Sequence, residues 1–241
     1  MMDGPWTTIG AVAAYLYVVL VLGPRLMANQ KPFSLRQLLI GYNAAQVLFS
    51  LFMFWELKHE CTALHFQMVT LCWWYYISKL TEFADTIFFV LRKKDSQITP
   101  LHLYHHCLTP LETWICVKYI GGGHGTFSNL INNLVHIIMY SYYLLAAMGP
   151  EYSKYLWWKK YLTSIQMMQF ALVFIHSAQV FFISCSYPRI VAAFLLLHSS
   201  IFFGLFMDFY CTAYSVSWQD IKARWRIKLQ INVIKKEDHQ K

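Results

Sequence analysis

The chain has 241 residues, of which 57% are hydrophobic, 18% aromatic and only 13% charged. About a quarter of the residues of an ordinary soluble domain are charged, so this composition argues against a soluble globular protein. The formal net charge of +8 can suggest a nucleic acid partner. Here the basic residues lie in short segments between apolar stretches, where anionic lipid headgroups or a polyphosphate ligand explain them. We therefore expect membrane lipids as partners and no nucleic acid.

Seven apolar stretches are long enough to cross a bilayer, which takes about twenty helical residues. In chain order they cover residues 7–27, 37–55, 64–91, 101–119, 126–147, 159–183 and 190–214. No small-residue cleavage site follows the first stretch, so we expect it to be retained as a span. The pattern predicts an all-α integral membrane protein with seven transmembrane helices. One membrane domain covers 1–221, and a basic cytosolic tail covers 222–241.

The lysines and arginines predict how these spans are oriented. An odd number of spans puts the two termini on opposite sides of the membrane. With the C-terminus in the cytosol, sixteen of the twenty basic residues fall on the cytosolic side, three fall outside, and Lys79 lies within a span. Cytosolic loops carry such an excess of basic residues. Cys61 and Cys185 then map to loops outside the cytosol, where oxidation is possible, and a disulfide between them stays open.

Four of the predicted spans carry polar side chains at helical spacing. Such residues are costly within a membrane and are functional candidates for that reason. In chain order the sets are Lys79, Glu82, Asp85 and Thr86; His102, His105 and His106; Asn132, His136, Tyr140 and Tyr143, with Tyr142 on an adjacent face; and Thr163, Gln166 and Gln169. We expect the four stripes to converge on one interior cavity whose apolar lining would suit a long apolar ligand. Isolated intramembrane histidines such as His176 and His198 are interpreted as core residues.

The His-x-x-His-His string at 102–106 is compatible with more than one chemistry. Neutral imidazoles are common metal ligands, but a di-iron site needs several such boxes and this chain has one. A mononuclear metalloenzyme of lipid oxidation stays open. An imidazole can also attack a thioester or shuttle protons, and burial among apolar walls keeps it in the neutral, nucleophilic form. A non-catalytic lipid binder is the third alternative.

At these four motifs the chain resembles the very-long-chain fatty acid elongases of the endoplasmic reticulum, the 3-ketoacyl-CoA synthases of the ELO type. The family's Lys-x-x-Glu-x-x-Asp-Thr motif matches residues 79–86, and its histidine box matches 102–106. Its Asn-x-x-x-His-x-x-Met-Tyr-x-Tyr-Tyr motif matches 132–143, and its Thr-x-x-Gln-x-x-Gln motif matches 163–169. The chain looks insect-like and nearer to the animal elongases of longer acyl chains.

The resemblance implies a fold and a reaction. Six of the seven helices would wrap a closed hydrophobic acyl tunnel. The enzyme, a very-long-chain 3-oxoacyl-CoA synthase, would condense acyl-CoA with malonyl-CoA and release CoA and CO₂. His105 would carry the acyl group as an acyl-imidazole. His136 would assist from the opposite wall, and His102 and His106 would orient groups or shuttle protons.

The resemblance also implies the contacts of the two CoA substrates. The residues expected to bind substrate or line its path are Lys79, Glu82, Asp85, Arg92, Lys94, Gln97, Asn132, Tyr142, Lys159, Thr163 and Gln166. No metal and no further cofactor is expected. The expected location is the endoplasmic reticulum membrane, with the N-terminus in the lumen. Expected partners are the reductases and the dehydratase of the elongation cycle, and a homodimer is possible.

Overall fold

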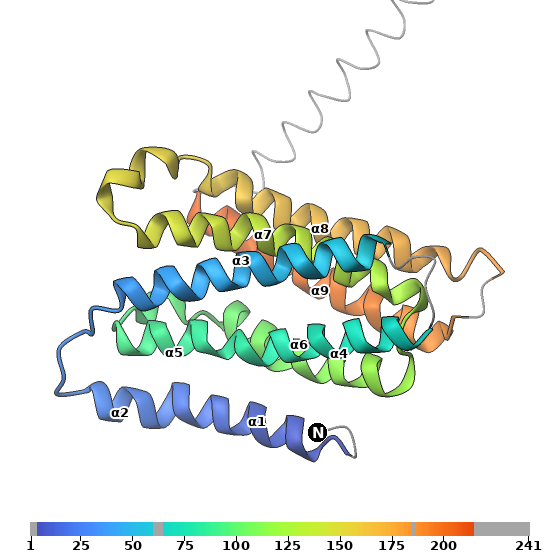
Figure 1. The fold of residues 1–241 in the computed structure, drawn as a ribbon, viewed down its shortest axis with the longest axis horizontal. Coiled ribbons are helices and arrows are strands. Elements are labelled where there is room, and N and C mark those ends of the chain that lie inside the picture. Colours follow the sequence, from blue (N-terminus) through green and yellow to red (C-terminus); the bar gives the residue numbers. More distant parts are fainter. Residues whose placement is uncertain (1–3, 60–64, 185–186, 215–241) are drawn as a thin grey trace, which may run out of the picture.

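The computed structural model describes residues 4–59, 65–184 and 187–214. Within these ranges the protein is a bundle of helices that lie side by side, with no β-strand (Figure 1). The helices are α1 (Trp6–Tyr17), α2 (Gly23–Met27), α3 (Arg36–His59), α4 (His65–Thr81), α5 (Phe83–Leu91), α6 (Pro100–Tyr119), α7 (Thr126–Ala147), α8 (Lys159–Gln179) and α9 (Arg189–Ala213). Short helical turns are Val18–Leu22, Asp95–Gln97, Gly123–Gly125 and Pro150–Tyr155. The predicted tail, Cys61 and Cys185 lie outside the described residues.

Four helical stretches of the described chain are long and apolar enough to cross a membrane, namely Trp6–Met27, Arg36–His59, Gly123–Ala147 and Arg189–Ala213. The other three predicted spans are also helical, in α4 with α5, in α6 and in α8. They carry three of the four polar stripes, which lower their hydropathy. Large apolar side chains such as Trp6, Phe182 and Ile190 are 78–88% exposed, as lipid-facing residues would be. The protein is therefore a multi-pass membrane protein, while the count of seven spans stays a prediction.

Three of the predicted cytosolic segments meet at one end of the bundle. The Phe33 amide donates to the Leu91 carbonyl at 3.0 Å, and the Lys93 ammonium donates to the Ala28 carbonyl at 3.3 Å. The Arg36 guanidinium, at the start of α3, donates to the carbonyl of Met148 at the end of α7. These bonds join the chain before α3, after α5 and after α7. The loops therefore share one end of the molecule, as the predicted orientation requires.

The third predicted span is not one continuous helix. We expected a span over 64–91, but a turn at Glu82 separates α4 from α5. The Asp85 amide donates to the Glu82 carbonyl at 3.1 Å, three residues back, which tightens the backbone locally. Glu82 is only 2% exposed, so the break places a carboxylate inside the bundle.

The pair of α1 and α2 lies along one side of the bundle (Figure 1). It is held by a cluster of buried apolar residues in which Tyr15, Val19 and Met27 pack against Val90 of α5. The partly buried Leu103 and Cys107 of α6 extend this cluster. The first helix therefore contacts the two helices that carry the carboxylate motif and the histidine box.

Candidate functional site

The histidine box lies in the first two turns of α6. Thr99 precedes the helix, and its hydroxyl accepts a hydrogen bond from the His102 amide at 3.2 Å, while Pro100 occupies the first helical position. Both are typical of a helix start. The ring centroids of His102 and His106 are 4.2 Å apart, and those of His105 and His106 are 5.1 Å apart. The three imidazoles therefore form one compact cluster, as predicted from their spacing.

His102 is anchored to the preceding helix. Its Nε2 atom lies 2.7 Å from the Thr86 hydroxyl of α5, and its ring lies 5.4 Å from that of Phe89. The Thr86 hydroxyl is also 2.9 Å from the Tyr15 hydroxyl of α1. Thr86 is fully buried and Tyr15 is 4% exposed. Three helices therefore meet in one short hydrogen-bonded chain.

A second buried network surrounds the break at Glu82. The Lys79 ammonium donates to Glu82 Oε1 at 2.8 Å and to Asn132 Oδ1 at 2.8 Å. Asn132 Oδ1 also accepts from the Tyr75 hydroxyl at 2.8 Å. His136 Nδ1 lies 3.5 Å from Glu82 Oε1. The network therefore joins α4, the α4–α5 turn and α7, and it brings His136 to the carboxylate.

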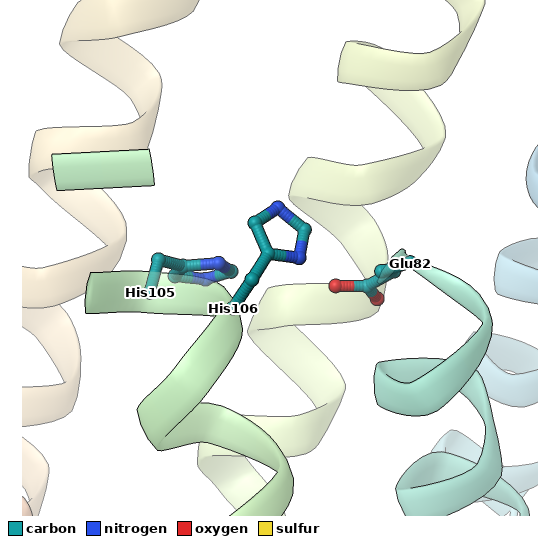
Figure 2. Close-up of side chains that lie close together, drawn as sticks. All are labelled: Glu82, His105 and His106. Atoms are coloured by element: carbon teal, nitrogen blue, oxygen red, sulfur yellow. The ribbon is translucent and has the colours of Figure 1, made fainter. Parts of the chain in front are cut away.

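The carboxylate of Glu82 faces the histidine box across the interior. In Figure 2 it points toward the ring of His106, with His105 next to His106 on the same helix. Ligand atoms of Glu82, His105 and His106 all lie within 4.8 Å of one another, close enough to hold a metal ion. The Lys79 ammonium already binds this carboxylate, and its charge opposes a second cation there. The donor set therefore fits an imidazole–carboxylate site better than a metal centre.

A cavity of about 90 Å³ lies beside the box, between α4, α6, α7, α8 and α9. Its lining includes His105, Glu112, Asn132, Gln169, His198 and Phe202. Of the three box histidines, all within the described chain, only His105 lines it. The His105 ring also packs edge-on against Phe202, 5.3 Å between centroids. His105 is therefore the box imidazole that a ligand in this cavity would meet.

The residues predicted to bind substrate divide into three groups. Lys79, Glu82, Asp85 and Asn132 are inside the bundle, where Asp85 accepts a hydrogen bond from the Tyr140 hydroxyl at 2.8 Å. The second group lies at the end of the bundle where the loops meet. Lys94 and Gln97 are exposed on the segment after α5, and Lys159 is exposed at the start of α8. Arg92, at the end of α5, is half-buried.

The third group belongs to α7 and α8. Tyr142 is buried, with its ring 5.0 Å from that of Trp158, and Thr163 is also buried. Gln166 donates to the sulfur of Met139 at 3.5 Å, and Gln169 lines the cavity. The structure therefore brings three of the four polar stripes into contact and adds the fourth through Gln169. It does not join the exposed basic residues to the buried cluster.

Some residues of the site were missed from sequence. Tyr15 and Tyr75 gave no signal, because an aromatic residue in an apolar span is ordinary. Glu112 did give a signal, because a carboxyl group within a predicted span is a functional candidate. It contacts His198 Nδ1 of α9. His198, interpreted as a core residue, therefore has a buried acidic partner.

Comparison with known proteins places this membrane protein in a family. Residues 1–220 match the ELO, or GNS1/SUR4, family. A very long chain fatty acid elongase of Aedes aegypti is 46% identical over 90% of this chain and 65% of its own length. Elongase 7 of Drosophila melanogaster is 48% identical over 89% of this chain and 70% of its own length, and elongase 7 of Rattus norvegicus is 44% identical over 89% and 83%.

The fold and the interior histidine cluster define a multi-pass helical membrane protein with an interior polar site. The chain belongs to the ELO family, which confirms the resemblance found in its motifs. It spans slightly less than two thirds of the length of the Aedes relative.

Proposed function

We propose that the protein is a condensing enzyme of fatty acid elongation, a 3-oxoacyl-CoA synthase that joins acyl-CoA to malonyl-CoA. The observation that carries the proposal is the position of His105, which lines the central cavity while His102 is bound to Thr86. A neutral imidazole facing a cavity is a competent nucleophile toward a thioester. The names of the relatives support the same reaction class.

The reaction is proposed to proceed in two steps. A nitrogen of His105 attacks the thioester carbonyl, the carbon–sulfur bond breaks, and CoA leaves with the imidazole proton. Malonyl-CoA then loses CO₂, and the resulting enolate carbon attacks the acyl-imidazole. The carbon–nitrogen bond breaks, and the released nitrogen takes up a proton from water, moved by His136, so that neutral His105 is regenerated. The product is a 3-oxoacyl-CoA two carbons longer, and no metal or further cofactor takes part.

The other site residues have supporting roles in this proposal. His136 of α7, which lies beside Glu82, would move a proton during the second half-reaction. His102 and His106 would orient the box. The wall opposite the box would be formed by Lys79, Glu82, Asp85 and Asn132. These residues would keep the substrate carbonyl groups near the histidines.

The residues predicted to contact CoA divide between the basic end of the bundle and α7–α8. Arg92, Lys94, Gln97 and Lys159 would bind the phosphates and the adenosine, because charge-assisted bonds favour phosphate oxygens. Tyr142, Thr163 and Gln166 would line the path inward. We place this end in the cytosol and the protein in the endoplasmic reticulum membrane, where the reductases and the dehydratase would use its product. A homodimer is included in this proposal.

The test uses the purified full chain in detergent with a long-chain acyl-CoA alone. We expect about one equivalent of CoA release and an acyl adduct in the intact mass, both absent in His105→Ala. His59→Ala is the matched control, because His59 is exposed at the far end of α3. CoA release only after malonyl-CoA is added would reject the acyl-imidazole in favour of a single ternary complex. No turnover with both substrates in folded protein would favour a lipid binder.

A further inference from the structure

We propose that Tyr15 of α1 is a positioning residue of the histidine box, acting through Thr86 on the tautomer and orientation of His102. This inference rests on the proposed function for its kinetic test. The hydrogen-bonded chain itself is a feature of the described structure. It gives the first helix, which otherwise lies along the side of the bundle, a part in the site.

The geometry is a continuous chain of three side chains. The Tyr15 and Thr86 hydroxyl oxygens are 2.9 Å apart, and Thr86 Oγ1 is 2.7 Å from His102 Nε2. The Tyr15 ring is stacked on Phe83, with centroids 4.3 Å apart and an interplanar angle of 14°. Because this stacking holds the ring in place, removing the hydroxyl alone would break the chain without moving the helix.

The direction of the chain follows from proton counting. A hydroxyl has one proton to donate, and a neutral imidazole donates from one nitrogen and accepts at the other. Among the described residues, the Tyr15 hydroxyl is hydrogen-bonded to Thr86 alone. If Thr86 donated to Tyr15, the Tyr15 proton would have no acceptor. The order that uses every hydroxyl proton within the chain therefore runs from Tyr15 to Thr86 to His102 Nε2, and it puts the imidazole proton on Nδ1.

This order has a consequence for the whole box. The His102 ring packs against His106 at 4.2 Å, and His106 packs against His105 at 5.1 Å. A His102 ring that rotates or changes tautomer alters the surface against which His106 packs. Because His106 packs against His105, the change also affects the position of the proposed nucleophile. Tyr15 lies 6.5 Å from the His106 ring and has no place in the cavity lining, so it acts through other residues.

The kinetic test compares Tyr15→Phe with Thr8→Val. Thr8 lies on the same helix, is fully buried, and shares a 2.8 Å hydrogen bond with the Tyr76 hydroxyl of α4, away from the box. At metal sites, losing the outer hydrogen-bond partner of a ligating histidine typically costs about 10- to 100-fold, and we take the lower end of that range for this histidine cluster. We therefore expect kcat of Tyr15→Phe to fall about tenfold or more, with KM for both CoA substrates within about twofold. Thr8→Val should match the wild type in both, and Thr86→Ser, which keeps the hydroxyl, should retain most of kcat.

A second measurement does not depend on activity. Ring ¹⁵N spectra of histidine-labelled protein report the tautomer of each imidazole, and His102→Gln assigns the His102 signals. We expect a single Nδ1–H tautomer for His102 in the wild type and in Thr8→Val, and a mixture in Tyr15→Phe. Identical His102 signals in Tyr15→Phe and wild type overturn the inference, whatever the activity. If Tyr15→Phe shows the predicted tautomer change while the wild type has no elongation activity, the proposed function fails and the hydrogen-bonded chain stands.

Discussion

Lys79 and Glu82 place opposite charges in an interior where each side chain is 2% exposed. Removing one partner of such a pair leaves a buried charge without compensation, which costs about 3–5 kcal/mol, whereas replacing both by neutral groups of similar volume is often tolerated. Substituting one residue of the pair therefore affects stability more than substituting both. Comparing single and double variants separates the effect on stability from the effect on function.

We expect Glu82→Gln to unfold at a clearly lower temperature than the wild type in the same detergent, because Lys79 keeps its charge and loses its carboxylate. The double variant Lys79→Met/Glu82→Gln should recover most of that loss. Elongation should be abolished in both, because both lose the carboxylate that faces the histidine box (Figure 2). A double variant less stable than Glu82→Gln would contradict this account of the pair.

The same pair predicts how the site responds to metal removal. Glu82, His105 and His106 are close enough to hold an ion, but Lys79 binds the carboxylate. We expect dialysis against a chelator to leave elongation unchanged and the metal content of active protein to be well below one equivalent. Activity that is lost on dialysis and restored by one metal would favour the metalloenzyme alternative.

At the scale of helices, the contact between Glu112 and His198 ties α6 to α9 beside the cavity. Both side chains are largely buried, at 13% and 11% exposed. Residues in direct contact usually show coupling energies of about 0.5–3 kcal/mol in a double-mutant cycle. We therefore expect Glu112→Gln and His198→Phe to be non-additive in unfolding free energy. Additive effects would show that the two helices are held by their apolar contacts alone.

A matched cycle keeps this prediction specific. Ser200 lies on α9 near His198 but bonds the Leu196 carbonyl of its own helix at 2.7 Å. Combining Ser200→Ala with Glu112→Gln should give additive effects, within about 0.5 kcal/mol, as expected for residues without shared partners.

The helices show what sequence could and could not predict. Hydropathy and helical spacing were sufficient to predict helices at all seven stretches and to group the histidines of α6 on one turn. The turn at Glu82 could not be predicted, since no proline or glycine marks it. Tyr15 was missed for a related reason: its role depends on Thr86 and His102, which are distant in sequence and become neighbours only when α1 packs on α5 and α6.

For the whole molecule, the arrangement separates a buried polar site, the proposed reaction site, from a basic end. The bonds from Phe33 to Leu91 and from Arg36 to Met148 gather the loops at that end. Chemistry on a thioester is favoured in a dry interior, whereas the polyanionic CoA headgroup is favoured near water and cations. A ligand with a charged head and a long apolar arm fits this division, with its reacting carbonyl between the two parts.

This division predicts different kinetic effects at the two ends of the bundle. Lys94 is exposed on the loop after α5, and an exposed ion pair contributes about 0.2–1 kcal/mol. We expect Lys94→Ala to raise KM for acyl-CoA and malonyl-CoA by up to about fivefold, with kcat unchanged. Lys58→Ala, at the opposite end of α3, should leave both constants unchanged.

Salt distinguishes this electrostatic effect from a packing defect. The Debye length falls from about 10 Å at 0.1 M ionic strength to about 3 Å at 1 M. If Lys94 acts by attracting CoA phosphates, raising the salt concentration should increase KM of the wild type toward that of Lys94→Ala, and the two should converge. A KM difference that persists at 1 M salt would mean that Lys94 shapes the loop instead. A KM increase in Lys58→Ala without one in Lys94→Ala would place the CoA headgroup at the other end of the bundle and reverse the proposed orientation of the substrate.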